Sequence, residues 1–592
     1  MLIKALCDYY NKVMVPNKYA DPKGYESVRI THTIYLNTDG TIDNIIDNRD
    51  KNETIILPKR LSKSAINAEI IEHRPSYIFG LEYDKENDKF FSSDKSKKSN
   101  ESFKEKNFKF VEGMDSDIVN AYRNFILTWD AGNETRNDYL MEISRDYNKS
   151  KFEFRLAENS KKSLQDDEQV KIRWDCEKEK GLSSEGKYNT QCAVLGEDKT
   201  IARIHNKIKG IGRSTGAVLV SFENADCSYG REQSYNSNIS NDAMEKYTEA
   251  LKYILDTKNN KIILGDIIVT FWAIDKESKC EECVAEIIGG RSNKEDAEDT
   301  QKMLKGLILD AKKGNLSKDR ISVIDSDVDF YIVGLQPNSA RIAVKFIYHR
   351  KYGDILENIA KYQSDMQASE DIKIIPFWKI KKAISPLIGN KTSDQSEIIT
   401  KLFKSIIYGY KYPEMLLSIA VNRVKIEARD SKDKNRTELQ AAIIKGCLNR
   451  KSLNKEELKM SLDENNQNSA YICGRLFAVL EKIQIDSVRE NSPKKKLNRT
   501  IKDSYFSAAC STPASIFPQI LKLSQYHLEK LENEGFKIGY KKLIGTIINK
   551  LDGSFPKHFS LDDQGRFIIG YYHQTQDFYK SKKEQNDNEE EI

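Results

Sequence analysis

The spacing of apolar residues changes part-way along this sequence of 592 residues. Before about residue 390, apolar side chains alternate with other residues over short runs such as 28–36 and 341–348, and this period of two is typical of half-buried strands. From about residue 395 the spacing becomes three and four, as in 471–485 and 540–551, which is the period of amphipathic helices. The sequence therefore predicts an α+β fold, in which a mixed α/β N-terminal region with antiparallel strands precedes a C-terminal all-helical bundle.

The predicted domain boundaries follow the same change. We expect residues 1–390 to form a mixed α/β domain, within which the polar, low-complexity segment 84–107 is a mobile insertion. Residues 391–459 are expected to form a helical connector. Residues 460–580 contain three amphipathic helices, and because each can bury its apolar stripe only against the others, they predict a bundle. Residues 581–592 are almost wholly polar and are predicted to be disordered.

Composition limits the class of protein. Apolar residues make up 39% of the chain, which is sufficient for the cores of two or more domains. The most apolar stretch, 262–274, is interrupted by Gly265 and Asp266 and is too short to span a membrane. The nine cysteines are odd in number and scattered, unlike the framework of a secreted disulfide-rich domain. We therefore expect a cytoplasmic protein without a membrane partner.

Basic residues are concentrated in one region of the chain. Lys and Arg number 95 and Asp and Glu 90, a net charge of +5, but segment 436–560 alone holds 21 basic and 13 acidic residues, a local +8. A regional excess of this kind predicts contact with nucleic-acid phosphates, and a solvated surface, above all at 494–496, is the alternative interpretation. The candidate phosphate contacts are Arg475, Lys482, Arg489, Lys494, Lys495, Lys496, Arg499 and Lys502.

A polar loop follows an apolar run in segment 214–238. Residues 217–222 predict a buried strand, after which the sequence becomes abruptly polar. A polar loop held on a strand presents its side chains to a ligand, and this mixture of rings, amides and hydroxyls suits nucleic acid. The alternative is a hydrogen-bonded surface loop with packed tyrosines. The candidate base contacts in this loop are Asn224, Ser228, Tyr229, Gln233 and Asn236.

A second polar turn lies earlier in the chain. Arg74 precedes Pro75, which biases it toward an extended conformation, and Ser76 and Tyr77 follow in a short loop. The candidate nucleic-acid contacts in this turn are Arg74, Ser76 and Tyr77. The alternative is a turn that buries Tyr77 together with the two apolar residues after it.

The sequence offers no recognisable catalytic constellation. The glycine-rich segment 210–216 lacks the Gly-Lys-Ser/Thr ending of a phosphate loop and precedes a predicted strand, whereas a phosphate loop opens a helix. Cys280 and Cys283 have the spacing of zinc ligands, but no second pair of Cys or His lies near them in the sequence. The seven histidines are dispersed. We therefore expect a protein that is not an enzyme and holds no metal or cofactor.

Short blocks along nearly the whole chain carry a resemblance to one known family. They include 74–80 (RPSYIFG), 216–222 (GAVLVSF), 334–341 (GLQPNSAR), 474–484 (GRLFAVLEKIQ) and 570–574 (GYYHQ). The number, order and spacing of these blocks carry the resemblance. In them the chain resembles the large subunit of the subtype I-C Cascade complex of bacterial CRISPR immunity, the CRISPR-associated eight-c family.

The resemblance implies a function. It implies a non-catalytic subunit that sits at the 5′ end of the guide crRNA, beside a guide-end subunit and the Cascade backbone subunits. Such a subunit recognises the protospacer-adjacent motif of double-stranded target DNA, supports R-loop formation along the displaced single strand, and recruits a separate helicase-nuclease. The two polar loops would then read the motif. The alternatives are a nuclease or guide-RNA-processing enzyme, and a purely structural scaffold.

The resemblance also implies a second product of the same gene. In this family the helical C-terminal part can be made separately by internal initiation and line the complex as small-subunit copies. Here Met460 precedes the predicted bundle, and residues 455–459 (KEELK) can be encoded by purine-rich codons that resemble a ribosome-binding site. The alternative is that Met460 is an ordinary residue of the helical region.

Overall fold

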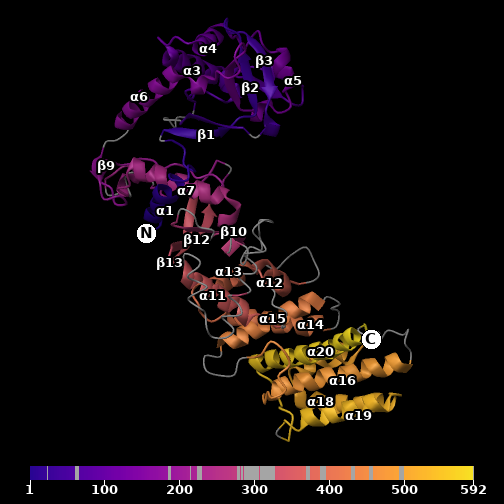
Figure 1. Ribbon diagram of the computed structural model, residues 1–592. Coiled ribbons are helices and arrows are strands. Elements are labelled where there is room, and N and C mark those ends of the chain that lie inside the picture. Colours follow the sequence, from indigo (N-terminus) through magenta and orange to yellow (C-terminus); the bar gives the residue numbers. More distant parts are fainter. Residues whose placement is uncertain are drawn as a thin grey trace. The chain divides into compact units, whose positions relative to one another are not determined.

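The computed structural model describes two compact units. Unit 1 contains Met1–Lys12, Asn206–Val220 and Tyr247–Ile592, and unit 2 contains Val13–His205 and Ser221–Lys246. Figure 1 shows both units and labels many of their helices and strands. The described residues are 1–592 except 23, 52, 60–65, 185–187, 214, 223–229, 276–280, 282–283, 286–305, 307–326, 369–373, 387–394, 429–433, 452–457, 492–498, 552 and 591–592.

Unit 2 is built on a three-stranded sheet of order β3-β2-β7. Strands β2 (His32–Leu36) and β3 (Ile42–Asp47) are antiparallel, and β7 (Phe152–Leu156) runs parallel to β2. Its apolar core centres on Phe79, whose ring contacts Trp129 and Phe152 edge-on at centroid distances of 5.2 Å. The other elements are β1 (Tyr25–Arg29), β4 (Thr54–Pro58), β5 (Glu82–Asp84), β6 (Lys89–Phe91), β8 (Asn189–Gln191), β9 (Asp198–Thr200), α2 (Pro75–Ile78), α3 (Asp94–Val111), α4 (Asp117–Thr128), α5 (Asp138–Glu142) and α6 (Glu168–Ser184).

Two features of unit 2 differ from the sequence predictions. The single strand predicted over 28–36 is divided, because β1 pairs with β4 in a separate sheet while β2 pairs with β3 and β7. The insertion predicted to be mobile contains most of α3, which starts with a capping box between Ser93 and Ser96 and buries Phe103 and Phe110. Two buried aromatic residues, together with side-chain hydrogen bonds of Asn100 and Asn107 to the backbone, therefore anchor a mostly polar helix.

Unit 1 is organised around an antiparallel sheet of order β10-β11-β12-β13. On one face, Phe330 lies 5.3 Å from Tyr352 of α11, so the helices of unit 1 cover this face. On the other face, Trp272 stacks on Tyr331 and also contacts Tyr9 of the first helix. The strands are β10 (Lys261–Leu264), β11 (Ile267–Ala273), β12 (Asp329–Asn338) and β13 (Arg341–Lys351).

From residue 352 onward, the helices of unit 1 share one apolar core with the sheet. This core includes residues from Ile262 of β10 to Tyr572 of the last helix. The predicted boundaries at 391 and 460 therefore lie inside unit 1. The helices are α1 (Leu2–Tyr9), the C-terminal part of α7 (Asn241–Asp256), α11 (Tyr352–Asp365), α12 (Phe377–Ile384), α13 (Ser396–Ile407), α14 (Glu414–Glu427), α15 (Lys434–Lys451), α16 (Ser469–Asn491), α17 (Ile501–Ala509), α18 (Pro513–Glu529), α19 (Glu534–Ile548) and α20 (Leu561–Glu590).

The C-terminal helices confirm the predicted α+β order, with mixed strands and helices first and helices afterwards. Helix α20 continues to Glu590, into the segment for which the sequence predicts disorder. It lies beside α16 in Figure 1, and glycines of each helix face the backbone of the other: a Cβ on Gly474 would lie 2.0 Å from the Phe567 carbonyl oxygen, and one on Gly570 would lie 2.2 Å from that of Tyr471. No helix in the described ranges is both long and apolar enough to cross a membrane.

Candidate nucleic-acid interface

Arg74 is held in an ion pair within unit 2. Its Nε and Nη2 donate to Oε1 and Oε2 of Glu72 at 2.7 and 2.5 Å, and its guanidinium lies 3.7 Å from the centroid of the Tyr77 ring. Glu72 is fully buried and also accepts the backbone N–H groups of Glu69, His73 and Arg74 at 2.9–3.1 Å. The Nε and Nη2 groups of Arg74 are therefore both engaged within the protein, in a two-pronged contact with one carboxylate.

The electrostatics of this pair favour the charged forms. Burial alone would raise the pKa of Glu72, but the hydrogen bonds and positive charge of Arg74 outweigh it and hold the pKa below its ordinary value. Burial likewise disfavours the cationic form of Arg74, and the carboxylate outweighs that effect, so the pKa of Arg74 is raised. The pair therefore fixes the turn before α2.

Among the described residues, Glu69, Glu72 and His73 form a group whose ligand-type atoms lie within 4.8 Å of one another. The donor set does not favour a metal ion, because the Glu72 carboxylate already accepts a guanidinium and three backbone N–H groups. A cation bound there would have to displace Arg74. The arrangement fits a guanidinium better than a metal.

The residues after Arg74 are mostly packed. Tyr77 is 8% exposed and belongs to the apolar core, together with Ile78 and Phe79, which are fully buried. The Asn100 side-chain amide donates to the carbonyls of Tyr77 and Ile78 at 2.8 Å. Ser76 is half-buried. The turn therefore buries Tyr77, as in the alternative interpretation of the sequence. The Tyr77 ring lies in the core rather than on a binding surface.

Two guanidinium groups, one beside the later loop and one within it, are not among the residues predicted from the sequence. Arg203 and Arg231 are exposed, and Arg203 Nη1 donates to Oε1 of Gln233 at 2.7 Å. Gln233 begins a short 3₁₀ helix and has a φ of +45°. Asn236 uses its amide nitrogen internally, donating to the carbonyls of Arg231 and Gln233 at 2.9 and 2.8 Å. Asn224, Ser228 and Tyr229 lie outside the described residues.

The segment predicted as a buried strand at 217–222 is instead a bridge between two other segments of unit 1. Ala217 is buried and exchanges backbone hydrogen bonds with Ile208 at 2.8 and 3.0 Å. Val218 accepts from Ile342 and donates to Ala340, both at 2.9 Å. Phe222, which belongs to unit 2, is 40% exposed. The strand prediction is wrong because these residues pair singly on two sides and extend no sheet.

These bridges hold an exposed basic loop against the β12–β13 hairpin. Arg213 Nη2 donates to Oγ of Ser339 at 2.8 Å, two residues before Arg341. Gly216 has a φ of +87°, and a Cβ there would lie 2.7 Å from the Ile208 carbonyl oxygen, so this turn requires glycine. Lys207, Lys209, Arg213 and Arg341 are exposed, and we name them the cationic platform.

Three of the four platform residues could have been found from the sequence. Residues 201–222 contain four basic residues, Lys207, Lys209 and Arg213 among them, and no acidic one. When charges are counted over stretches as long as 436–560, so short a cluster is averaged out. Comparing 210–216 with nucleotide-binding loops does not reveal it either. Anion binding by a short basic loop requires neither a long basic segment nor a nucleotide-binding motif.

The basic residues of the helical region divide into packed and exposed groups. Arg475 is 3% exposed and donates from Nε to Oε1 of Gln574 at 3.0 Å, so its predicted phosphate contact is corrected to a packing role between α16 and α20. Lys482 is 19% exposed at its side chain and pairs with Asp486 one turn later. Lys502 lies 5.1 Å from the ring centroid of Tyr571. Arg489 and Arg499 are exposed, and Lys494, Lys495 and Lys496 lie outside the described residues.

The comparisons with known proteins concern almost the whole chain. None of the curated proteins compared with the sequence matches it. One family model, described as CRISPR-associated protein (Cas_Csd1), matches residues 6–579. A match over this length includes both units and the sequence blocks quoted above, and it supports a subunit of the Cascade type. The chain therefore belongs to the CRISPR-associated Csd1 family.

Proposed function

We propose that this protein is the non-catalytic large subunit of a type I-C CRISPR interference complex that binds target DNA in the cytoplasm. The cationic platform is the observation that carries the proposal, because its four exposed cations lie on two segments joined by backbone hydrogen bonds. Cations held in this way are suited to the phosphates of a nucleic acid. Arg489 and Arg499 add two exposed cations on the helical part of unit 1, and half-buried Lys502 adds a third.

The proposed partners are those of a complex that opens DNA along a guide. They are the guide crRNA, the double-stranded target with its displaced single strand, the Cascade backbone and guide-end subunits, and a separate helicase-nuclease. Base pairing with the guide would read the target, while this subunit would read the protospacer-adjacent motif and support R-loop formation. A metal-dependent cleavage assay on the purified chain tests the non-catalytic part of the proposal, which strand cleavage would contradict.

Removing two cations of the platform should weaken DNA binding irrespective of sequence. In the double variant Arg213→Gln and Arg341→Gln, we expect the slope of log K against log salt to fall by about 0.9 for each phosphate that is no longer neutralised, and so by about two for the pair. The measurement is a salt titration of duplex binding. Lys401→Gln is the control, because Lys401 is 62% exposed at its side chain on α13 of the same unit. An unchanged slope in the double variant would favour a merely solvated surface.

Motif reading should depend on the loop of unit 2. We expect Arg231→Ala or Gln233→Ala to reduce the affinity ratio between duplexes with the correct and an incorrect adjacent motif, by about 1–3 kcal/mol for each base-edge hydrogen-bonding pair that is removed. Binding of the assembled complex to the two duplexes measures this ratio. Gln191→Ala alters an exposed glutamine of unit 2 outside this loop and should leave the ratio unchanged. If the ratio survives in both loop variants, the motif is read elsewhere.

The separate small subunit remains part of the proposal. Met460 is 8% exposed, and Leu458, two residues before it, is held to α15 by two hydrogen bonds between its backbone and the Asn449 side chain. Gly565 of α20 packs against Ile444 and Leu448 of α15, so a product starting at Met460 would expose this face of α20. A C-terminal tag should reveal a second band that Met460→Leu removes. A single full-length band would exclude internal initiation there.

A further inference from the structure

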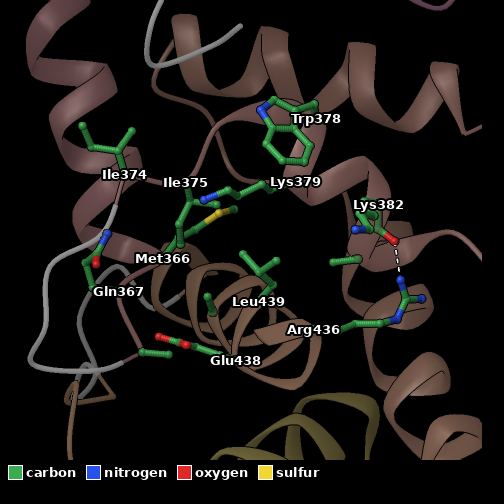
Figure 2. A pocket seen from close by; sticks show the side chains of 13 residues that line it. Met366, Gln367, Ile374, Ile375, Trp378, Lys379, Lys382, Arg436, Glu438 and Leu439 are labelled. Carbon is green, nitrogen blue, oxygen red and sulfur yellow. Dashed lines mark hydrogen bonds between the residues drawn. The ribbon is translucent and has the colours of Figure 1, made fainter. Parts of the chain in front are cut away.

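A pocket of about 370 Å³ lies among α11, α12 and α15 of unit 1 (Figure 2). Its floor is apolar and includes Met366, Ile375 and Leu439. Trp378 and Lys379 stand on one side of it, and Glu438 lines it from α15. A volume of this size is near the lower end of the range of small-ligand sites, roughly 300–1,000 Å³.

Hydrogen bonds fix the walls of the pocket. The Ile375 N–H donates to Gln363 Oε1 at 2.9 Å, and its carbonyl accepts from Gln363 Nε2 at 3.0 Å and from the Tyr362 hydroxyl at 2.6 Å. At the other end of α12, Arg436 donates to the Lys382 carbonyl at 2.5 Å and pairs with buried Glu427 at 2.8 Å. The backbone at Ile375 and Lys382 is therefore held in place, which lowers the ordering cost of binding at these two described parts of the wall.

Trp378 differs from the other tryptophans of the chain. It is 51% exposed, whereas Trp129 is 7%, Trp174 2% and Trp272 0% exposed. A large ring that stays half-exposed beside an apolar pocket leaves apolar area in water that a ligand would cover. On a helix whose two ends are held, such a ring is a platform on which another flat ring can stack.

Charge distinguishes between two kinds of occupant. Segment 374–386 contains Lys379, Lys381 and Lys382 and no acidic residue, so the rim at Trp378 is cationic. Glu438 places a carboxylate, a hydrogen-bond acceptor, among the lining residues. A buried apolar side chain of a protein partner would use neither group. An unpaired nucleotide uses all of them, because it has a flat base, an exocyclic amino group in cytosine, adenine and guanine, and flanking phosphates.

We propose that this pocket binds one unpaired nucleobase of a single-stranded nucleic acid. The base stacks on Trp378, Lys379 and Lys382 contact the flanking phosphates, and Glu438 accepts a hydrogen bond from the exocyclic amino group. The proposal rests on the proposed function in one respect, since it requires the protein to meet a single strand. The strand can be the guide RNA or the displaced DNA, and both share this chemistry.

A thermodynamic cycle tests the stacking contact. Full-length protein is titrated with a short single strand and with an abasic strand of the same length, which keeps the phosphates and lacks the bases. We expect Trp378→Ala to bind the intact strand about tenfold more weakly and the abasic strand as tightly as the parent. Trp378→Phe should retain part of the affinity. Tyr410→Ala is the matched control, because Tyr410 is a 64% exposed aromatic residue of unit 1 outside the pocket lining.

Two further measurements test the polar contacts and the source of the strand. Oligo-dC should bind more tightly than oligo-dT, because only cytosine offers an amino group to Glu438, and Glu438→Gln should reduce this preference. Lys379→Gln with Lys382→Gln should lower the salt slope by about 0.7 for each contact. RNA and DNA strands of the same sequence are compared, and the one whose binding responds more to Trp378→Ala is the occupant.

Three results would overturn the proposal. They are an absence of binding to any single strand, equal losses for Trp378→Ala on intact and abasic strands, and normal strand binding by Trp378→Ala accompanied by loss of a partner subunit, which would identify a protein anchor. These strands lack an adjacent motif and a duplex. A failure of the pocket proposal can thus be distinguished from a failure of the proposed function. The proposed function is tested on duplexes, with variants of Arg213, Arg341, Arg231 and Gln233.

Discussion

Gly474→Ala is expected to disrupt the packing of α16 against α20. Its Cβ would lie 2.0 Å from the Phe567 carbonyl oxygen and 2.8 Å from the Tyr571 nitrogen, and both are backbone atoms that no rotamer change can move. The helices must separate, which uncovers the core on both sides of the contact. We expect the free energy of unfolding to fall by about 3 kcal/mol or more. Hydrogen exchange of the amides of α16 and α20 measures this loss locally.

The same substitution at an open position provides the control. Gly539 lies in α19 and is exposed, and a Cβ on it would have no neighbouring atom within 4 Å. Because alanine favours the helix over glycine, Gly539→Ala should be neutral or stabilising by about 0.5–1 kcal/mol. Similar exchange rates in the Gly474→Ala variant and the parent would mean that the helices tolerate separation, and the close approach would then have no energetic role.

Glu72→Ala is expected to destabilise unit 2 by about 3 kcal/mol, the lower end of the range for breaking a buried ion pair. The lower end applies because the Arg74 side chain is 28% exposed and regains some hydration. Three backbone N–H groups lose their acceptor in the same variant. Thermal unfolding followed through the unit 2 tryptophans measures the change. Lys162→Ala, which breaks an exposed pair with Asp117, should cost under about 1 kcal/mol.

The same pair gives unit 2 a dependence on pH. The pKa of Glu72 is lower in the folded protein than its ordinary value of 4.5, so the stabilisation is present above about pH 4.5 and is lost as the pH falls toward the folded pKa. Glu72→Gln should make the acid-side loss of stability shallower. An identical acid limb in the variant and the parent would show that Glu72 does not titrate with unfolding.

A substitution in this pair can also distinguish a structural role of Arg74 from a role in base reading. Because the guanidinium is engaged by Glu72, we expect Arg74→Ala to weaken DNA binding through loss of the turn, equally for correct and incorrect motifs. A selective loss of discrimination in a variant that remains folded would instead support the base contact predicted from the sequence.

The fold was predictable where a periodic pattern of apolar residues extended over several turns. The stripes at 471–485 and 540–551 correspond to α16 and α19, because an amphipathic helix repeats its signal over several turns. Helix α3 was missed because its buried residues include Asn107, whose side chain bonds to the backbone of Glu69 and Ile71. A buried polar residue whose side chain is hydrogen-bonded to distant backbone groups cannot be told from a surface residue in the sequence.

The candidate site was predictable only in part. Charge counts identified Arg489 and Arg499, which are exposed, and also Arg475, which is buried against Gln574, 99 residues later in the sequence. Composition reports how many cations a segment has but not which face of its helix carries them. The cationic platform requires the hydrogen bonds between residues 206–220 and the β12–β13 hairpin, and these are not visible in a local pattern.

The division of unit 1 into three chain segments sets an order for synthesis. Helix α1 leaves the ribosome well before its core partner Trp272, which is more than two hundred and sixty residues behind it. Unit 2 is complete at residue 246 and can fold while the nascent chain is still growing. The buried face of α1, with Leu2, Leu6 and Tyr9, gains its contact with Trp272 only after β11 has been made. A segment of unit 1 that is made before unit 2 therefore reaches its final place only after unit 2 and the sheet of unit 1 have been made.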